Sequence, residues 1–209
     1  TAKSVGVISQ DRALGITEIA RPAGVVGAIT PSTNPGATPA NMIINAMKGR
    51  NAIILAPSPK GYSTAQELVR YVHAEFDRIG APHNLVQLLP SPVSKALTYE
   101  LLAQVDLVVA TGSQANIRAA YSSGTPAFGV GAGNVAVVVD ASAEVDAAAD
   151  RIVRSKIFDN ATSCSSENSM IVVDDVYQAM IAAMQREGCI LLSADEKARL
   201  QQIMFPRGK

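Results

Sequence analysis

The 209-residue sequence has no tryptophan, only two cysteines and two histidines, and no net charge, because 18 Lys and Arg balance 18 Asp and Glu. Two separated cysteines cannot form a disulfide framework, and their number fits a reducing compartment. The histidines and cysteines also lack the spacing of a metal site. A neutral chain has no general electrostatic footprint for nucleic acid or an anionic membrane. These absences exclude a disulfide-rich secreted domain, a zinc module and a basic nucleic-acid-binding protein.

Long hydrophobic runs are absent as well. The longest, such as Val135–Val139, are far too short to span a bilayer, and no basic stretch precedes an apolar core as in a signal peptide. Apolar types nevertheless make up 48% of the chain and charged types 17%, which excludes a disordered protein. We expect a soluble, cytoplasmic protein with one domain, or one domain and part of another.

Aliphatic strands alternate with helical patterns along most of the chain. Val25–Thr30 is a continuous apolar run, typical of a strand buried on both faces. Thr38 is predicted as the N-cap of the next helix, with Pro39 in its first turn. Further strands are predicted at 51–56, 86–89, 105–110, 135–139 and 169–173, and further helices at 63–79, 92–104, 113–121, 144–158 and 174–187. The alternation predicts an α/β protein with a Rossmann-like parallel sheet, flanking helices and the start of a second α/β domain.

Cys164 stands in a segment of small polar residues, Asp-Asn-Ala-Thr-Ser-Cys-Ser-Ser-Glu-Asn-Ser, over residues 159–169. Structural cysteines usually have aliphatic neighbours, whereas a nucleophilic thiol must be reached by its substrate. Small neighbours leave room for a carbonyl group and present backbone N–H groups to an oxyanion. The residues alone fit a nucleophile and an incidental turn cysteine equally well. Cys189, in an aliphatic segment, is expected in a core.

Asn34 lies in the Pro-rich loop 31–37, directly after the buried strand. Parallel sheets bind ligands at the carboxyl ends of their strands, where a fixed amide N–H₂ could donate to a developing oxyanion. Asn before Pro is also common in turns, and the pattern by itself favours that interpretation.

Thr111, Gly112 and Ser113 follow a predicted strand and open a helix. That arrangement suits a phosphate at a helix N-terminus and equally an ordinary N-cap. Residues 128–134 are predicted as a glycine-rich turn. The turn is followed by a strand rather than a helix, so it is not the dinucleotide fingerprint.

Together, these segments resemble the aldehyde dehydrogenase family. Residues 22–35 resemble the segment that ends in the family's oxyanion asparagine, and residues 51–59 resemble its cofactor-side strand. Residues 110–113 resemble the turn near the cofactor pyrophosphate. Residues 128–140 resemble the glycine-rich turn and the domain-crossing strand, and residues 163–167 resemble the nucleophile loop. The segments occur in the family's order.

Departures from the family pattern narrow the resemblance. Hydrolytic members carry a Glu as general base where this sequence has Gly129, so activation of water is not expected. The coenzyme A-acylating branch also lacks that Glu and uses the coenzyme A thiol as the second nucleophile. Residues 121–134 and 158–160 resemble that branch, and residues 162–169 are similar to sulfoacetaldehyde-type acylating members.

Two further departures concern the cofactor and the length. Many members have a Lys that touches the adenosine ribose, where this sequence has Ala56. Lys60 is out of register, so NAD and NADP both stay open. Family enzymes are also considerably longer, so we expect this chain to be a fragment or a truncated product.

The resemblance implies specific roles. Cys164 would be the nucleophile, with Asn34 and the Cys164 backbone N–H as oxyanion donors. NAD or NADP would be the cofactor and coenzyme A the co-substrate of a small-molecule aldehyde. The protein would be a homo-oligomer with no metal, nucleic-acid or membrane partner. The residues that the resemblance assigns to cofactor binding are Thr30, Pro31, Ser32, Thr111, Gly112, Ser113 and Gly131.

The same resemblance implies a division of the chain. Residues 1–22, with strands predicted at 5–8 and 16–19, resemble an oligomerisation ribbon. Residues 23–140 would form the dinucleotide-binding domain, and residues 141–209 an incomplete catalytic domain that carries the nucleophile.

Two alternatives stay open. A glutamate-semialdehyde-type reductase also lacks the Glu, although its nucleophile context differs. An inactive nucleotide-binding or assembly fragment is the other, because the ribbon could persist through association alone.

Overall fold

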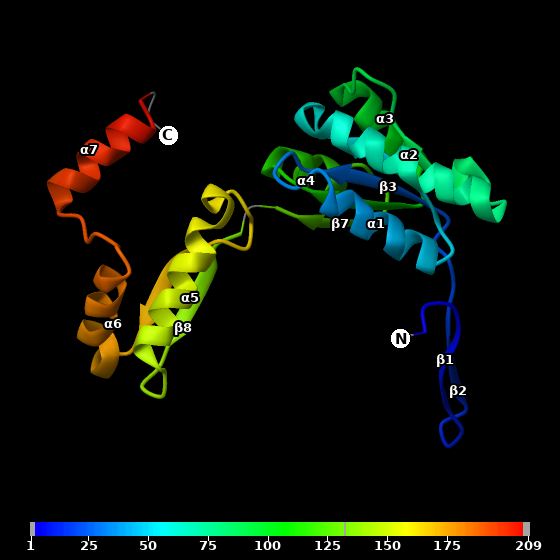
Figure 1. Cartoon of the computed structure of the whole chain (residues 1–209). Coiled ribbons are helices and arrows are strands. Elements are labelled where there is room, and N and C mark those ends of the chain that lie inside the picture. The colour runs from blue at the N-terminus through cyan, green and yellow to red at the C-terminus, as the bar shows by residue number, and fades with distance from the viewer. Residues whose placement is uncertain (1–2, 132, 207–209) are drawn as a thin grey trace. The chain divides into compact units, whose positions relative to one another are not determined.

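A computed structural model describes residues 3–131 and 133–206 (Figure 1). The chain forms two compact units, residues 1–132 and 133–209. The sequence-based boundary lay at Asp140. Strand β8 (Val135–Val139) belongs to the second unit, because it pairs there with β9 (Glu167–Val172).

The first unit is built on a five-stranded sheet in the order β5-β4-β3-β6-β7. Every neighbouring pair is parallel. The chain winds outward from β3 in both directions, which is the doubly wound topology and confirms the predicted Rossmann-like sheet. The strands are β3 (Val25–Thr30), β4 (Ala52–Pro57), β5 (Val86–Leu88), β6 (Leu107–Thr111) and β7 (Ala127–Val130).

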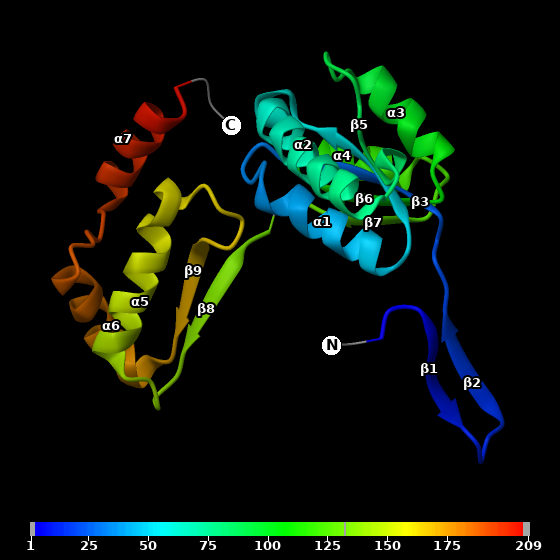
Figure 2. The same ribbon diagram turned by 45° about the vertical axis from the view of Figure 1, so that its right-hand side comes forward.

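Helices cover both faces of this sheet, as buried parallel strands require. One core joins α1 and α2 to the sheet, and a second core joins α3 and α4 to it (Figures 1 and 2). Strand β3 is buried from Val26 to Thr30, as its unbroken apolar sequence predicts. The helices are α1 (Ala37–Lys48), α2 (Tyr62–Ile79), α3 (Lys95–Gln104) and α4 (Gln114–Tyr121).

Polar side chains fix the start of β3 at the amino end of the sheet. The Val25 N–H donates to Asp106 Oδ2 at 2.7 Å, and the Gly24 N–H donates to Asn51 Oδ1 at 3.0 Å. Gly24 has a φ of +125°, and a Cβ there would stand 2.2 Å from Asp106 Oδ2. Only glycine therefore fits between β3 and Asp106.

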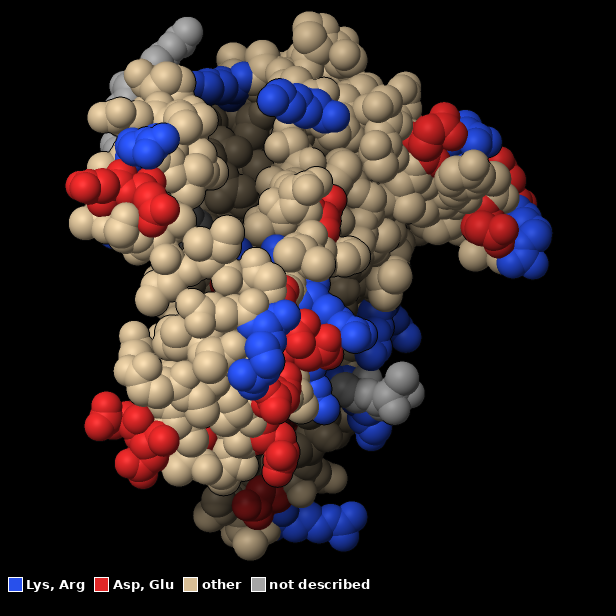
Figure 3. Space-filling model, turned by 60° about the vertical axis from the view of Figure 1, so that its left-hand side comes forward, with Lys and Arg blue, Asp and Glu red and all other residues tan. Residues whose placement is uncertain are grey.

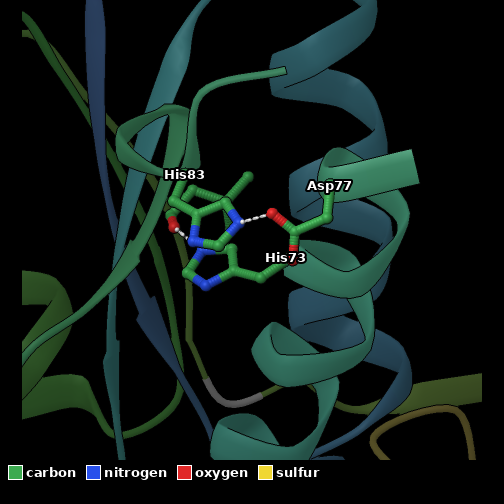
Figure 4. Close-up of polar contacts among 4 residues, drawn as sticks. His73, Asp77 and His83 are labelled. Carbon is green, nitrogen blue, oxygen red and sulfur yellow. Dashed lines mark hydrogen bonds and ion pairs between the residues drawn. The ribbon is translucent and has the colours of Figure 1, made fainter. Parts of the chain in front are cut away.

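Two histidines fasten α2 to the segment before β5 (Figure 4). His73 Nε2–H donates to the Val86 carbonyl at 2.8 Å, which fixes the tautomer of this ring. His83 Nε2 lies 2.8 Å from Asp77 Oδ1, and the two imidazole rings stack with centroids 4.2 Å apart. His73 is half-buried, as expected, and its contacts are structural.

The predicted ribbon is present as β1 (Gly6–Asp11) and β2 (Ile16–Ala20), which pair antiparallel. Figures 1 and 2 both show it projecting away from the five-stranded sheet. A two-stranded ribbon alone is marginally stable in water. Its apolar side chains are exposed within this chain: Val7, Ile8, Leu14, Ile16 and Ile19.

The second unit packs two helices against one face of the parallel pair β8–β9 (Figure 2). These helices are α5 (Val145–Ile157) and α6 (Asp174–Arg186), and an Asp146–Arg186 ion pair joins them. Their buried core consists of Val139, Ala149, Met180 and Ala183. Val138 and Ile171 on the strands stay 70% and 58% exposed, so this sheet has an apolar face that the described residues leave open.

A further helix, α7 (Ala194–Met204), was not predicted. Its start is marked by a capping box in which Ser193 and Glu196 exchange hydrogen bonds. All its residues are exposed, so local capping rather than packing defines it.

Three sequence-based boundaries were wrong. Helix α1 begins after Gly36 rather than with Thr38 as its N-cap. Helix α3 begins after Ser94, whose Oγ accepts the Leu97 N–H, and not at Pro92. Residues 127–130 form strand β7 instead of a glycine-rich turn, because backbone pairing with β6 outweighs the low strand propensity of glycine.

The surface carries both signs of charge. On the face drawn in Figure 3, Lys and Arg alternate with Asp and Glu between wide uncharged areas. Within the described residues, no helix is long and apolar enough to cross a membrane.

Candidate functional site

Asn34 lies in the loop that leaves the carboxyl end of β3. Its side-chain Oδ1 accepts the Ala37 N–H at 3.2 Å, so the amide caps the first turn of α1. The Asn34 side chain is exposed. With Oδ1 held by the backbone, the Nδ2 group keeps both of its protons for another acceptor. The predicted donor role is therefore compatible with the turn role, because the two use different atoms of one amide.

Thr30 ends strand β3 and is only 2% exposed. Its carbonyl accepts the Ser58 N–H at 3.1 Å, which ties the ends of β3 and β4 together. Its Oγ1 is buried and has no hydrogen-bond partner among residues 3–131 and 133–206. Buried hydroxyls are normally paired, so this atom keeps hydrogen-bonding capacity that the described residues do not use. Ser32, one residue beyond Pro31, is exposed at the same loop.

The segment after β6 opens α4 as expected. Ser113 is the N-cap, and its Oγ accepts the Asn116 N–H at 3.3 Å. Gly112 has a φ of +146°, and its N–H donates to the Val130 carbonyl at 3.2 Å. First-turn N–H groups have no acceptor within their helix. The N-terminus of α4 thus points free donors and a positive partial charge away from the sheet.

Gly131 lies beside this helix N-terminus. A Cβ at Gly131 would stand 2.7 Å from Gln114 Nε2. A glycine here lets the backbone approach the first residue of α4 closely.

Because β3 and β6 are neighbours, the loops after them share one edge of the sheet. The structure therefore brings together most of the predicted residues: Thr30, Pro31, Ser32, Asn34, Thr111, Gly112, Ser113 and Gly131.

The charge at this edge is one-sided. The loops 31–36, 58–61, 89–94 and 112–113 follow β3, β4, β5 and β6, and they contain no Asp or Glu. Lys60 follows β4, and Lys95 opens α3. An edge with two cations, no carboxylate in these loops and the positive ends of helix dipoles favours a polyanionic ligand.

A groove of about 370 Å³ runs between α3 and α4 on the same unit. Its lining combines Tyr99 and Leu102 on α3 with Arg118 on α4 and the hydroxyls of Ser122 and Ser123. Sequence reasoning missed this groove, because it is made by two helices whose facing residues have no common motif.

Cys164 lies at the second position of a tight turn in the second unit. The Ser166 N–H donates to the Ser163 carbonyl at 3.1 Å and closes the turn. The thiol-bearing residue is exposed. Among residues 133–206, the Cys164 backbone N–H has no acceptor, so it is free to donate. Access and a free N–H are what a nucleophile with its own oxyanion donor requires.

The backbone before this turn is strained. Asp159, Asn160 and Ala161 have φ values of 49°, 52° and 58°, so three consecutive residues other than glycine adopt the left-handed conformation. Each such residue costs about 1–2 kcal/mol. The Thr162 N–H donates to the Asp159 carbonyl at 3.0 Å and helps to hold the segment. Strained backbone conformations of this kind occur mainly at functional sites, and this one lies just before Cys164 in the chain.

Glu167 begins β9 three residues after the nucleophile position. Its own backbone N–H, the Ser155 hydroxyl and the charge of Lys156 hold the pKa of the carboxyl below its usual value. It lines a cavity of about 210 Å³ together with the half-buried Cys189 and side chains of β8, α5, β9 and α6, of which the apolar ones are Val137, Ile152, Val153, Ile157, Met170 and Met184. Cys189 was expected in a core and lies at the edge of one.

The sequence model of the aldehyde dehydrogenase family matches residues 3–189 of this chain. The chain belongs to the aldehyde dehydrogenase family.

Similar members of this family are acylating enzymes. The chain is 65% identical over 207 residues to "Sulfoacetaldehyde dehydrogenase (acylating)" of Cupriavidus necator, covering 99% of this chain and 42% of that protein. An acetylating aldehyde dehydrogenase from Geobacillus thermoglucosidasius superposes with a TM-score of 0.87 at 37% identity, covering 97% of this chain and 45% of that one.

A structure of propionaldehyde dehydrogenase from Rhodopseudomonas palustris with bound propionyl-CoA has a TM-score of 0.76 at 34% identity, covering 88% of this chain and 40% of that one. This chain therefore spans less than half the length of the curated relatives and solved structures that it matches. The α/β architecture and the family are established, and the activity of the whole protein is a proposal.

Gly129 stands where hydrolytic family members are expected to have their Glu. A Cβ at Gly129 would lie 2.8 Å from Ile117 Cγ2 and 3.0 Å from Tyr121 Cε2. The Gly129 N–H donates to Tyr121 Oη at 3.0 Å. Strand β7 packs so closely on α4 at this point that a Cβ fits only if the side chain of Ile117 or Tyr121 shifts.

Within the described residues, no group of three His, Cys, Asp or Glu side chains could hold a metal ion.

Proposed function

We propose that this protein oxidises a small aldehyde to an acyl-CoA with NAD or NADP, through a thioester on Cys164. The observation that carries the proposal is the exposed Cys164 at the apex of a tight turn, with its backbone N–H free. The acylating relatives support the same reaction class.

In the proposed reaction, the Cys164 thiolate adds to the aldehyde carbonyl carbon. The Cys164 N–H and the Asn34 Nδ2 protons would donate hydrogen bonds to the oxyanion that forms. A dinucleotide, when bound, would accept the hydride that leaves the former aldehyde carbon, so that Cys164 holds the acyl group as a thioester. The coenzyme A thiol then attacks this thioester, which releases acyl-CoA and the free cysteine.

The edge formed by the loops after β3, β4, β5 and β6 fits a dinucleotide. The unpaired Thr30 Oγ1, the α4 N-terminus and the small Gly131 provide donors and close backbone approach. Lys60 stands after β4, where NAD-specific sheets often carry a carboxylate for the ribose 2′-hydroxyl. The absence of an acid in loop 58–61 supports NADP as well as NAD.

Coenzyme A rather than water is the proposed acyl acceptor. Position 129 carries no side chain that could act as a general base, and a Cβ there would press on Ile117 and Tyr121. Without a base, water is a poor nucleophile toward a thioester, whereas a thiol is partly ionised near neutral pH.

The proposed aldehyde is sulfoacetaldehyde. The relative from Cupriavidus necator, which is 65% identical, is named for this substrate. The alternative of a glutamate-semialdehyde-type reductase has no comparable support.

The exposed apolar ribbon β1–β2 supports assembly into a homo-oligomer. Its side chains gain burial only against another surface, and a second copy offers the same ribbon. We place the protein in the cytoplasm, where its two cysteines stay reduced.

Activity is tested on protein expressed from the complete reading frame that contains these residues. With sulfoacetaldehyde, coenzyme A and NADP, the wild type should form acyl-CoA, and omission of coenzyme A should abolish product. Cys164→Ala should form none while binding the dinucleotide normally. Cys189→Ala is the matched control and should retain activity.

Acyl-CoA formation by Cys164→Ala would refute the nucleophile assignment. Product formation without coenzyme A would show hydrolysis instead. Dinucleotide binding with no turnover by the wild type would favour an inactive nucleotide-binding module.

A further inference from the structure

The hydroxyl groups on either side of Cys164 form a single unit. Ser163 Oγ and Ser165 Oγ lie 2.8 Å apart, and the Ser165 N–H donates to Ser163 Oγ at 3.3 Å. Cys164 stands between these two residues at the apex of the turn. In the sequence, the two serines therefore flank Cys164, the nucleophile of the proposed function.

This pair can donate a hydrogen bond to a further group. Each hydroxyl carries one proton, and the contact between the two oxygens uses only one of them. Ser165 is exposed and Ser163 is half-buried, so a ligand can reach the pair.

A third hydroxyl next to the nucleophile is also unpaired. Ser166 is only 5% exposed, and its Oγ has no hydrogen-bond partner in the described part of the chain. Glu167 Oε2, on the next residue, is also buried and has no hydrogen-bond partner in the described part of the chain. Buried polar atoms are usually paired, so the turn that carries Cys164 keeps hydrogen-bonding capacity that the described residues do not use.

Substrate chemistry identifies an acceptor that fits. In an aldehyde with a sulfonate on the carbon next to the carbonyl, the anion is only two bonds from the carbon that the Cys164 thiolate attacks. Groups that recognise this anion must then belong to the nucleophile turn or its immediate surroundings. Hydroxyl donors form short, strong hydrogen bonds to such oxygens.

We propose that the Ser163–Ser165 hydroxyl pair binds the anionic group next to the carbonyl and selects charged over alkyl aldehydes. This inference rests on the proposed function. An alkyl substrate leaves the hydroxyl proton without an acceptor, and unpaired donors penalise the wrong substrate more than a small change in apolar contact does.

The test compares sulfoacetaldehyde with propionaldehyde, which has an uncharged group of similar length. The readout is kcat/KM for acyl-CoA formation by the wild type, Ser165→Ala and Ser165→Thr, each expressed from the complete reading frame. Ser165→Ala should lose about 10- to 100-fold on sulfoacetaldehyde and less than about threefold on propionaldehyde. Ser165→Thr keeps a hydroxyl and should restore the preference.

Two additions sharpen this experiment. Malonate semialdehyde places a carboxylate where sulfoacetaldehyde has its sulfonate, so its response separates recognition of any anion from recognition of a sulfonate. Ser142→Ala removes an exposed hydroxyl of the same unit, which donates to Asp140 at 2.6 Å, and should leave both kcat/KM values unchanged.

An equal loss on both aldehydes in Ser165→Ala would assign the pair a purely structural role and overturn the inference. An unchanged preference in Ser165→Ala would overturn it as well. Failure of the wild type to form acyl-CoA from either aldehyde would instead overturn the proposed function.

Discussion

The two units hold the residues of the proposed site by different physical means. In the first unit, donors sit at the ends of buried parallel strands, so Asn34, Thr30 and Ser113 are fixed by a complete sheet with helices on both faces. In the second unit, Cys164 is carried on a short turn after a left-handed backbone segment. The residues around a sheet edge can vary without moving the strand ends, whereas the conformation of a strained turn depends on each residue in it.

The largest expected effect tests the sheet edge. Asn34→Ala should reduce acyl-CoA turnover about 10²–10³-fold, because an oxyanion donor acts where charge develops. Turnover is measured under saturating aldehyde and coenzyme A. Asn41→Ala on the exposed face of α1, whose amide contacts Asn45, is the control and should have little effect. A loss of less than about threefold in Asn34→Ala would leave that side chain as a helix cap only.

The next effect tests whether each unit has its own core. Leu102→Ala should destabilise the first unit and Met180→Ala the second, each by about 2–5 kcal/mol, because both side chains are fully buried. In calorimetry of the 209-residue chain, each substitution should lower a different transition. A single transition that responds to both substitutions would contradict the division into two units.

A smaller effect tests the strained turn. Ala161→Gly should stabilise the second unit by about 1 kcal/mol, because glycine adopts the left-handed conformation without steric cost. The free energy of unfolding by urea measures it. Gly133→Ala serves as a comparison, since a Cβ there meets no atom within 4 Å. Destabilisation in Ala161→Gly would mean that this segment is unstrained in solution.

The smallest effect concerns pH. The pKa of Glu167 is lowered in the folded state by its own backbone N–H, the Ser155 hydroxyl and Lys156. Its contribution to stability is therefore complete above the usual value of 4.5 and is lost as pH falls through the lowered pKa. Glu167→Gln should flatten the loss of stability of the second unit below that pH. An identical pH profile in the variant would show that Glu167 does not contribute to the pH dependence of stability.

The sequence correctly predicted those elements whose local residue pattern fits only one structure. The continuous run Val25–Thr30 identified the buried central strand, and Thr111-Gly112-Ser113 identified the start of α4. Both depend on local patterns with a single structural solution, a two-sided buried strand and an N-cap.

The sequence-based prediction failed for elements that depend on contacts beyond their own local sequence. The glycines after residue 127 signal a turn, yet pairing with β6 makes a strand of residues 127–130. Position 36 replaced Thr38 as the N-cap because Asn34 Oδ1 caps the Ala37 N–H from outside the helix. The hydroxyl pair beside Cys164 depends on how a turn folds back, which no residue pattern reveals.

Strand β7 and helix α4 meet at Gly129 with no space for a Cβ, and this has a consequence for protein engineering. In the proposed acylating reaction, Gly129→Glu alone should not introduce hydrolysis, because its Cβ would first have to displace the side chains of Ile117 and Tyr121. Smaller residues at those two positions would be needed as well. The proposed choice of acyl acceptor thus depends on the spacing of a strand and a helix, at a point distant in sequence from Cys164.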